Sequence, residues 1–223
     1  MRAAFKFRKG GATRYIAHLD LMRAMNRAIR RAGLPAQYSQ GFHPHIVMSF
    51  AQALGLGYLS EGEYMEISLP DGFPLAQAMD QLNSTLPEGL IAINAWQIPD
   101  GMATLMSQVT AARWRIEFDE PLAGENSMRF QALLDRETIE VIKDSKNGPA
   151  AMEIRKGIYS IEVKNGGVEL FLAAGSALNI RPELVVKAAL GSAECVRAMT
   201  RLELYAMIDG RQLPLSDIFV LEN

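Results

Sequence analysis

Apolar and polar residues follow two different periods in the first part of the chain. Between residues 3 and 8 apolar and basic residues alternate, which is the period-2 pattern of a β-strand. From Ala17 to Ala32 apolar residues instead recur every three or four positions, which predicts an amphipathic helix. Gly33 suits the position just after a helix, and Pro35 prevents its continuation. The apolar side of this helix is expected to consist of Leu21, Met25, Ala28, Ile29 and Ala32.

The same two periods predict the remaining elements. Strands are expected over residues 47–50, 63–69, 90–98, 113–118, 138–143, 152–156, 159–164, 168–173 and 197–207. Helices are expected over residues 71–86, 127–134 and 182–190. Asn165-Gly166-Gly167 is a hairpin signal, and GFHPHI at residues 41–46 has no period, so we expect a loop there.

This order of elements indicates the fold class. The first half reads βαββαβ, the order of the ferredoxin-like arrangement, and the second half mixes strands and helices in a similar way. We therefore expect an α+β fold with two ferredoxin-like halves and antiparallel sheets. The predicted domains are a basic N-terminal domain, residues 1–104, and a C-terminal α+β domain, residues 105–223.

Composition is that of a globular protein, but its charge is unevenly distributed. The chain has 223 residues, of which 49% are apolar and 22% charged, with a net charge of −2. Residues 1–50 contain nine basic residues and one acid, so the small net charge of the whole chain conceals a basic N-terminal segment. No apolar run approaches the length of a membrane span, no signal peptide is recognised, and there is one cysteine, Cys195. We expect a cytoplasmic protein with no membrane association.

Arginines lie on the polar side of the predicted helix. Arg23, Arg27, Arg30 and Arg31 fall within a narrow arc, and with Arg14 they are the candidate phosphate-binding residues. Three interpretations stay open. The arc is a solvated face paired with acids from the rest of the chain, a nucleic-acid interface, or a docking surface for an acidic protein.

All three histidines, His18, His43 and His45, lie near these arginines. Asp20, Glu61 or Glu63 could complete a metal site with them, but there is no HExxH pattern, and we expect neither a metal nor another cofactor. Histidines that donate hydrogen bonds or contact phosphate fit the sequence better. A hydrolase with Ser39, Ser49 or Ser60 and a histidine is the alternative, although a G-x-S-x-G elbow is missing.

Aromatic residues alternate with the basic ones over the same stretch. If exposed, they could stack on unpaired bases, although the core is the default position for Phe50, which follows an apolar strand. The residues concerned are Tyr15, Tyr38, Phe42, Phe50 and Tyr58.

Residues 5–69 contain five characteristic pieces, which are, in order, RYIAHLD, RAIRRAGLP, YSQGFHPH, SFAQALGLG and SEGEYMEI. In these pieces the chain resembles the DUF2344 family, also called radical SAM-linked proteins. The resemblance implies a separate radical SAM protein as partner. This chain has no CxxxCxxC and cannot ligate the required cluster itself, which fits an accessory subunit.

The family motif also gives a set of candidate site residues. Those expected to contact a ligand are His18, Asp20, Ser39, Gly41, Phe42, His45, Ser49 and Glu63. We expect a bacterial-type accessory module that binds RNA or a ribonucleoprotein for a radical SAM enzyme, with no catalytic residue assigned. The alternatives are an enzyme in its own right, with a His/Asp/Glu acid-base or metal site, and a protein-docking subunit that does not bind nucleic acid.

Overall fold

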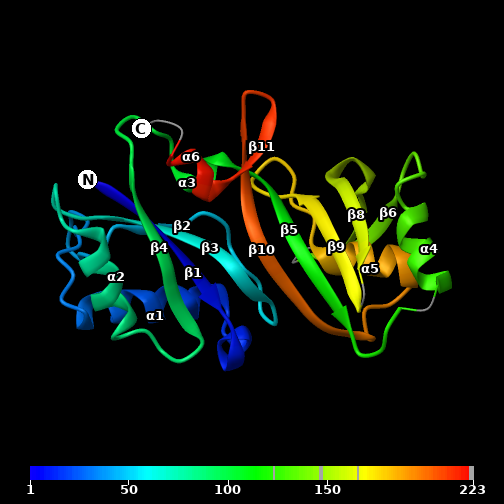
Figure 1. Cartoon of the computed structure of the whole chain (residues 1–223), viewed down its shortest axis with the longest axis horizontal. Coiled ribbons are helices and arrows are strands. Elements are labelled where there is room, and N and C mark those ends of the chain that lie inside the picture. Colours follow the sequence, from blue (N-terminus) through cyan, green and yellow to red (C-terminus); the bar gives the residue numbers. More distant parts are fainter. Residues whose placement is uncertain (123, 146–147, 165, 221–223) are drawn as a thin grey trace. The chain divides into compact units, whose positions relative to one another are not determined.

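The computed structural model describes residues 1–122, 124–145, 148–164 and 166–220. The chain separates into two compact units, shown in Figure 1: unit 1 is Met1–Val109 with Glu203–Asn223, and unit 2 is Thr110–Leu202. These bounds differ from the predicted 1–104 and 105–223, because the chain from Glu203 onward packs with unit 1. The α+β class with a mostly antiparallel sheet is confirmed.

The part of unit 1 before Val109 contains four strands and three α-helices. Its elements in chain order are β1 (Arg2–Lys9), η1 (Gly11–Tyr15), α1 (His18–Arg31), β2 (Met48–Phe50), β3 (Leu59–Ser68), α2 (Leu75–Asn83), β4 (Leu90–Ile98) and α3 (Leu105–Gln108). The strand order is β4-β1-β3 with β2 beside β3, and each of these pairings is antiparallel. This is the strand order of a βαββαβ ferredoxin-like unit.

Unit 2 has the same strand order with an insertion. Its elements are β5 (Val109–Phe118), α4 (Gly124–Ala132), β6 (Glu140–Ser145), β7 (Gly148–Glu153), η2 (Arg155–Gly157), β8 (Ile158–Lys164), β9 (Gly167–Ala173), α5 (Pro182–Leu190) and β10 (Val196–Ile208). The order is β10-β5-β9-β8, and β6 and β7 form a separate hairpin. The strand predicted at 152–156 is found earlier, as β7. Of the predicted turn, Asn165 lies outside the described residues.

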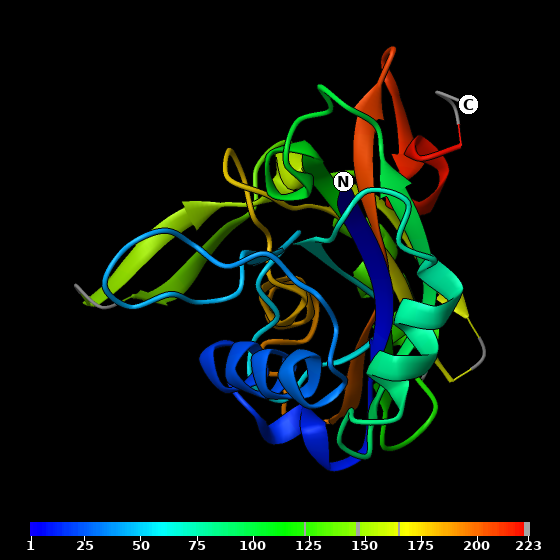
Figure 2. The same ribbon diagram turned by 90° about the vertical axis from the view of Figure 1, so that its left-hand side faces the viewer.

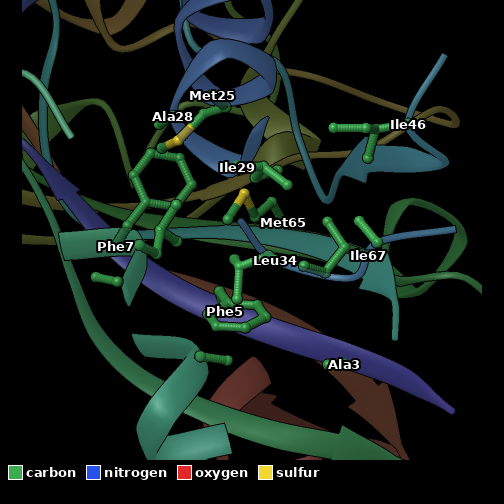
Figure 3. Packing of buried hydrophobic residues seen from close by; sticks show 14 of the residues in the cluster. Ala3, Phe5, Phe7, Met25, Ala28, Ile29, Leu34, Ile46, Met65 and Ile67 are labelled. Atoms are coloured by element: carbon green, nitrogen blue, oxygen red, sulfur yellow. The ribbon is translucent and has the colours of Figure 1, made fainter. Parts of the chain in front are cut away.

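One face of the unit 1 sheet carries the core. Ala3, Phe5 and Phe7 of β1 alternate toward α1, and Met65 and Ile67 stand opposite Phe5 and Ala3 on β3. Figure 3 shows Met25, Ala28 and Ile29 of α1 above these strand residues. Truncation of a residue buried like Met25 costs about 2–5 kcal/mol, so this layer holds α1 in place.

The opposite face of this sheet is covered by the end of the chain. β11 (Arg211–Pro214) pairs with β10, and α6 (Leu215–Ile218) follows. Trp96 stacks on both Tyr64 and Phe219. Burial, and then the Glu203 carboxylate to which its hydroxyl donates, raise the pKa of Tyr64. Lys6 also donates to Glu203, so buried aromatic and polar contacts both tie the chain end to unit 1.

Within the described ranges, no helix combines the length and apolar character that crossing a membrane requires.

Candidate functional site

Helix α1 presents four polar side chains in one stripe. Arg23, Asn26, Arg27 and Arg30 are spaced i, i+3, i+4 and i+7, so they neighbour one another along the helix surface. The three arginines are exposed, while Leu21, Met25, Ala28 and Ile29 are buried on the other side, as predicted. We call Arg23, Asn26, Arg27 and Arg30 the arginine stripe.

The end of α1 turns the chain sharply. Gly33 has φ +66°, its N–H bonds the Arg30 carbonyl at 3.2 Å, and the Leu34 N–H bonds the Ile29 carbonyl at 3.3 Å. These two bonds form a Schellman motif, for which glycine is the favoured residue because it has no Cβ. The buried Leu34 completes the motif and starts the chain on its way to β2.

Residues Gln37–Val47 form a small hairpin where the sequence predicts only extended chain and a loop. The Val47 N–H bonds the Gln37 carbonyl at 2.8 Å, and the Ser39 N–H bonds the His45 carbonyl at 2.8 Å. Tyr38 and Ile46 form a bridge between these pairs. Figure 2 shows this segment extending away from the sheet of unit 1, and we call it the 37–47 hairpin.

Two further contacts pin His45 to the facing strand of the 37–47 hairpin. The Ser39 Oγ accepts the His45 backbone N–H at 3.1 Å and lies 2.9 Å from the His45 Nδ1. Nδ1 also lies 3.4 Å from the His43 carbonyl oxygen, which can only accept a hydrogen bond. The contacts of Nδ1 with Ser39 and with His43 both hold the ring against the backbone of the hairpin.

The arginine stripe and His45 line one pocket of about 300 Å³. No carboxylate is among its lining residues, which are Arg23, Asn26, Arg27, Arg30 and His45. Arg30 also lies over the Tyr38 ring, 5.8 Å from the ring centroid, which places helix and hairpin against each other. The structure therefore brings together four of the predicted site residues in one basic depression.

Little negative charge compensates this pocket. Arg23 Nη1 pairs with Asp20 Oδ1 at 2.9 Å, but both side chains are mostly exposed, so the pair is screened by water and salt. In the described part of the chain, no carboxylate lies within ion-pair distance of Arg27 or Arg30. The local potential is consequently positive, which favours an anionic group.

The other two candidate arginines contact backbone instead of the pocket. Arg31 Nη2 donates to the Thr85 carbonyl at 2.7 Å, and Arg14 Nε donates to the Gly57 carbonyl at 3.2 Å. Each guanidinium therefore holds a neighbouring loop of unit 1. They contribute charge to the surroundings but do not line the pocket.

Several predicted ligand contacts lie away from the pocket. Glu63 is only 1% exposed on β3, on the same face as Met65 and Ile67, so it is not placed to contact a ligand at the surface. His18 is half-buried and packs edge-on against Phe50, with 5.4 Å between ring centroids. Ser49 is half-buried on β2, opposite Glu66. Of His18, Asp20 and His45, only His45 lines the pocket.

Asn26 is the pocket residue that we did not predict. Its Nδ2 donates to the Met22 carbonyl at 3.0 Å, and its amide lies between the arginines of the stripe. Helical spacing contained the signal, since position 26 lies three residues after Arg23 and four before Arg30.

No group of three or more His, Cys, Asp or Glu residues in the described ranges is arranged to hold a metal ion.

Comparison with known proteins identifies the family of the chain. No curated protein matches the chain. A solved structure, the crystal structure of a Cbf5-Nop10-Gar1 complex, aligns with a TM-score of 0.47 at 8% identity, over 91% of this chain and 48% of that chain. The present chain thus spans about half the length of that one. The family described as "Uncharacterized protein conserved in bacteria (DUF2344)" matches residues 2–182, and the chain therefore belongs to the DUF2344 family.

Proposed function

We propose that unit 1 binds RNA through its phosphate backbone, using the arginine stripe and His45. The observation that carries this proposal is the pocket lined by three arginines, an asparagine and a histidine without any carboxylate. Arginine offers planar, paired donors that match phosphate oxygens, and the Asn26 amide and the His45 ring add neutral hydrogen bonds. Such contacts position a nucleic acid without reading its sequence.

The spacing of the stripe suits a chain of phosphates better than one isolated anion. Arg23 and Arg30 are seven residues apart on α1, which corresponds to about 10 Å along a helix axis. Cations distributed over that length can contact successive phosphates of one strand. A compact single-phosphate site would instead gather its donors around one point.

The proposed role is that of an accessory module for a separate radical SAM protein. This part of the proposal rests on the family resemblance and on the cysteine content of the chain. The sequence has one cysteine, Cys195, whereas an iron-sulfur cluster of that class needs three cysteine ligands. The module would hold the RNA while the partner performs the radical chemistry.

Charge reversal of one arginine tests the RNA-binding proposal. We expect Arg27→Glu to weaken binding of a fluorescein-labelled single-stranded RNA at least tenfold at low salt, because it removes a phosphate contact and adds repulsion. Fluorescence anisotropy titration measures this. Arg129→Glu is the matched control, since Arg129 is similarly exposed but lies on α4 of unit 2. Wild-type protein that binds no RNA, or equal losses in both variants, would contradict the proposal.

One observation favours an enzymatic alternative. The Ser39 Oγ lies within hydrogen-bond distance of the His45 Nδ1, as in a nucleophile-base pair beside a basic pocket. However, the second contact of Nδ1 is with the His43 carbonyl at 3.4 Å, where a nucleophile-base pair would have an orienting carboxylate. If this alternative holds, the purified protein cleaves phosphate esters or RNA and Ser39→Ala abolishes the cleavage while RNA binding persists.

A further inference from the structure

Phe42 is the most exposed large apolar side chain described in the structure, at 101% of its reference area. A whole phenyl ring in water forgoes the favourable burial that aromatic residues ordinarily obtain. The ring lies at the tip of the 37–47 hairpin, between Gly41 and His43. Single exposed apolar side chains are common on protein surfaces, so the significance of this ring depends on what lies beside it.

The hairpin constrains the backbone on both sides of this ring. Its two strands are joined by the Gln37–Val47 and Ser39–His45 backbone bonds and by the Ser39–His45 side-chain contacts. Gly41 has φ +127°, a conformation that side chains other than glycine rarely adopt, and it sets the direction of the tip. The ordered backbone reduces the backbone entropy that is lost on binding, which favours binding.

The ring is also close to the proposed phosphate pocket. Phe42 precedes His45 by three residues, and three extended residues span at most about 10 Å. His45 lines the pocket. A nucleotide whose phosphate occupies the pocket therefore has its base, or that of its neighbour, within reach of Phe42.

Phe42 differs from the two other exposed aromatic residues near α1. Arg14 lies 5.4 Å from the centroid of the Tyr15 ring, and Arg30 lies 5.8 Å from the centroid of the Tyr38 ring. No ring or cation of the described residues lies over Phe42. Both faces of Phe42 are consequently available for stacking, whereas one face of each tyrosine is already engaged.

We infer that Phe42 is a stacking platform for an unpaired base, and that the ligand of this site is single-stranded nucleic acid. This inference rests on the proposed RNA-binding function and narrows its substrate class. In a duplex each base is already stacked on both sides and paired, so it has no free face for Phe42. Single-strand binders combine a basic track for the backbone with aromatic residues of this kind.

Substitution of Phe42 tests the inference with two RNA probes. We expect Phe42→Ala to weaken binding of a 12-nucleotide single-stranded RNA by about five- to 100-fold, and to leave binding of a 12-base-pair RNA duplex unchanged. Phe42→Trp should retain single-strand affinity, and Phe42→Leu, which keeps apolar area but no ring, should lose it. Anisotropy measures affinity, and quenching of 2-aminopurine in the single strand reports stacking directly.

The outcomes distinguish failure of the stacking inference from failure of the proposed RNA-binding function. If wild-type protein binds neither RNA, both fail. If it binds single-stranded RNA and Phe42→Ala binds it equally well, or loses affinity for both probes alike, only the stacking inference fails. Because Phe42 is fully exposed, thermal unfolding of the variants should match that of the wild type, which controls for misfolding.

Discussion

Two clusters of three basic residues in this protein differ in what surrounds them. On α1, Arg23, Arg27 and Arg30 line a pocket of about 300 Å³ without a carboxylate. In unit 2, a pocket of about 210 Å³ contains three cations and two acids. Its lining residues are Arg115, Glu117, Lys164, Gly166, Gly167, Val168, Glu169 and Arg197. The number of cations is equal, but the net charge is not.

Ion pairing in unit 2 follows from its strands. Arg115 stands directly opposite Glu169 across β5 and β9, with 3.9 Å between Nε and Oε1. Arg197 pairs with Glu117 at 2.9 Å, and Lys164 pairs with Glu162 at 3.0 Å. Cross-strand neighbours of opposite sign stabilise a sheet, whereas α1 carries its arginines in one stripe with a single acid at its edge. The stripe therefore keeps more net positive charge for a ligand than the unit 2 pocket does.

The largest expected effect is the loss of RNA affinity when the arginines of α1 are neutralised, compared with the same change in the unit 2 pocket. We expect the triple variant Arg23→Gln, Arg27→Gln, Arg30→Gln to bind single-stranded RNA about 100-fold more weakly at 50 mM salt. The matched triple variant Arg115→Gln, Lys164→Gln, Arg197→Gln should stay within about threefold of the wild type, because its cations are already paired. Anisotropy titrations at one salt concentration make the comparison. Equal losses would show that pairing does not distinguish the clusters.

A smaller effect is expected from placing an acid in the α1 pocket. Asn26→Asp keeps the shape of the side chain but gives the arginine stripe a carboxylate like those in unit 2. RNA affinity should fall about fivefold, since the new charge competes with phosphate for Arg23 and Arg30. Asn26→Ala, which removes only the amide, serves as control in the same titration and should lose less. A larger loss for Asn26→Ala would mean that the amide matters more than the charge.

The sequence predicted α1 and its buried face because a helix of this length shows its period directly. The sequence also indicated that Glu63 lies on the buried face of the sheet, because residues 63, 65, 67 and 69 share one side of a strand. Family resemblance outweighed that signal when Glu63 was counted as a ligand contact. The return of Glu203 and Phe219 to unit 1 depends on contacts with Tyr64 and Trp96, more than 100 residues earlier, and no local period encodes it.

Release of Arg23 from its neighbour should have a modest effect. Asp20→Asn removes the only carboxylate paired with the stripe among the described residues, so RNA affinity should rise about twofold. The free energy of unfolding should change by no more than about 1 kcal/mol, as is usual for exposed pairs. Anisotropy and urea denaturation measure the two quantities. A fall in RNA affinity would indicate that Asp20 itself contacts the ligand.

The smallest effect concerns the pairing in unit 2 and its dependence on pH. The hydrogen bond from Lys164, then its charge, lowers the pKa of Glu162 below its usual value of 4.5, with Arg113 adding to the effect. A carboxyl whose pKa is lower in the folded than in the unfolded protein stabilises the fold at pH values above its unfolded-state pKa. This stabilisation is lost as the pH falls through its folded-state pKa. Glu162→Gln should therefore lower Tm slightly at pH 7, and the gap should close in acid. A gap independent of pH would contradict this pairing.

The most direct test of the central claim is the salt dependence of RNA binding by the intact protein. For a single strand, each phosphate contact makes the slope of log K against log salt concentration more negative by about 0.7. With three arginines in contact, neutralising Arg23, Arg27 and Arg30 to glutamine should make the wild-type slope about 2 shallower. A wild-type slope near zero, or a slope that these substitutions leave unchanged, would contradict binding of RNA phosphates by the arginine stripe.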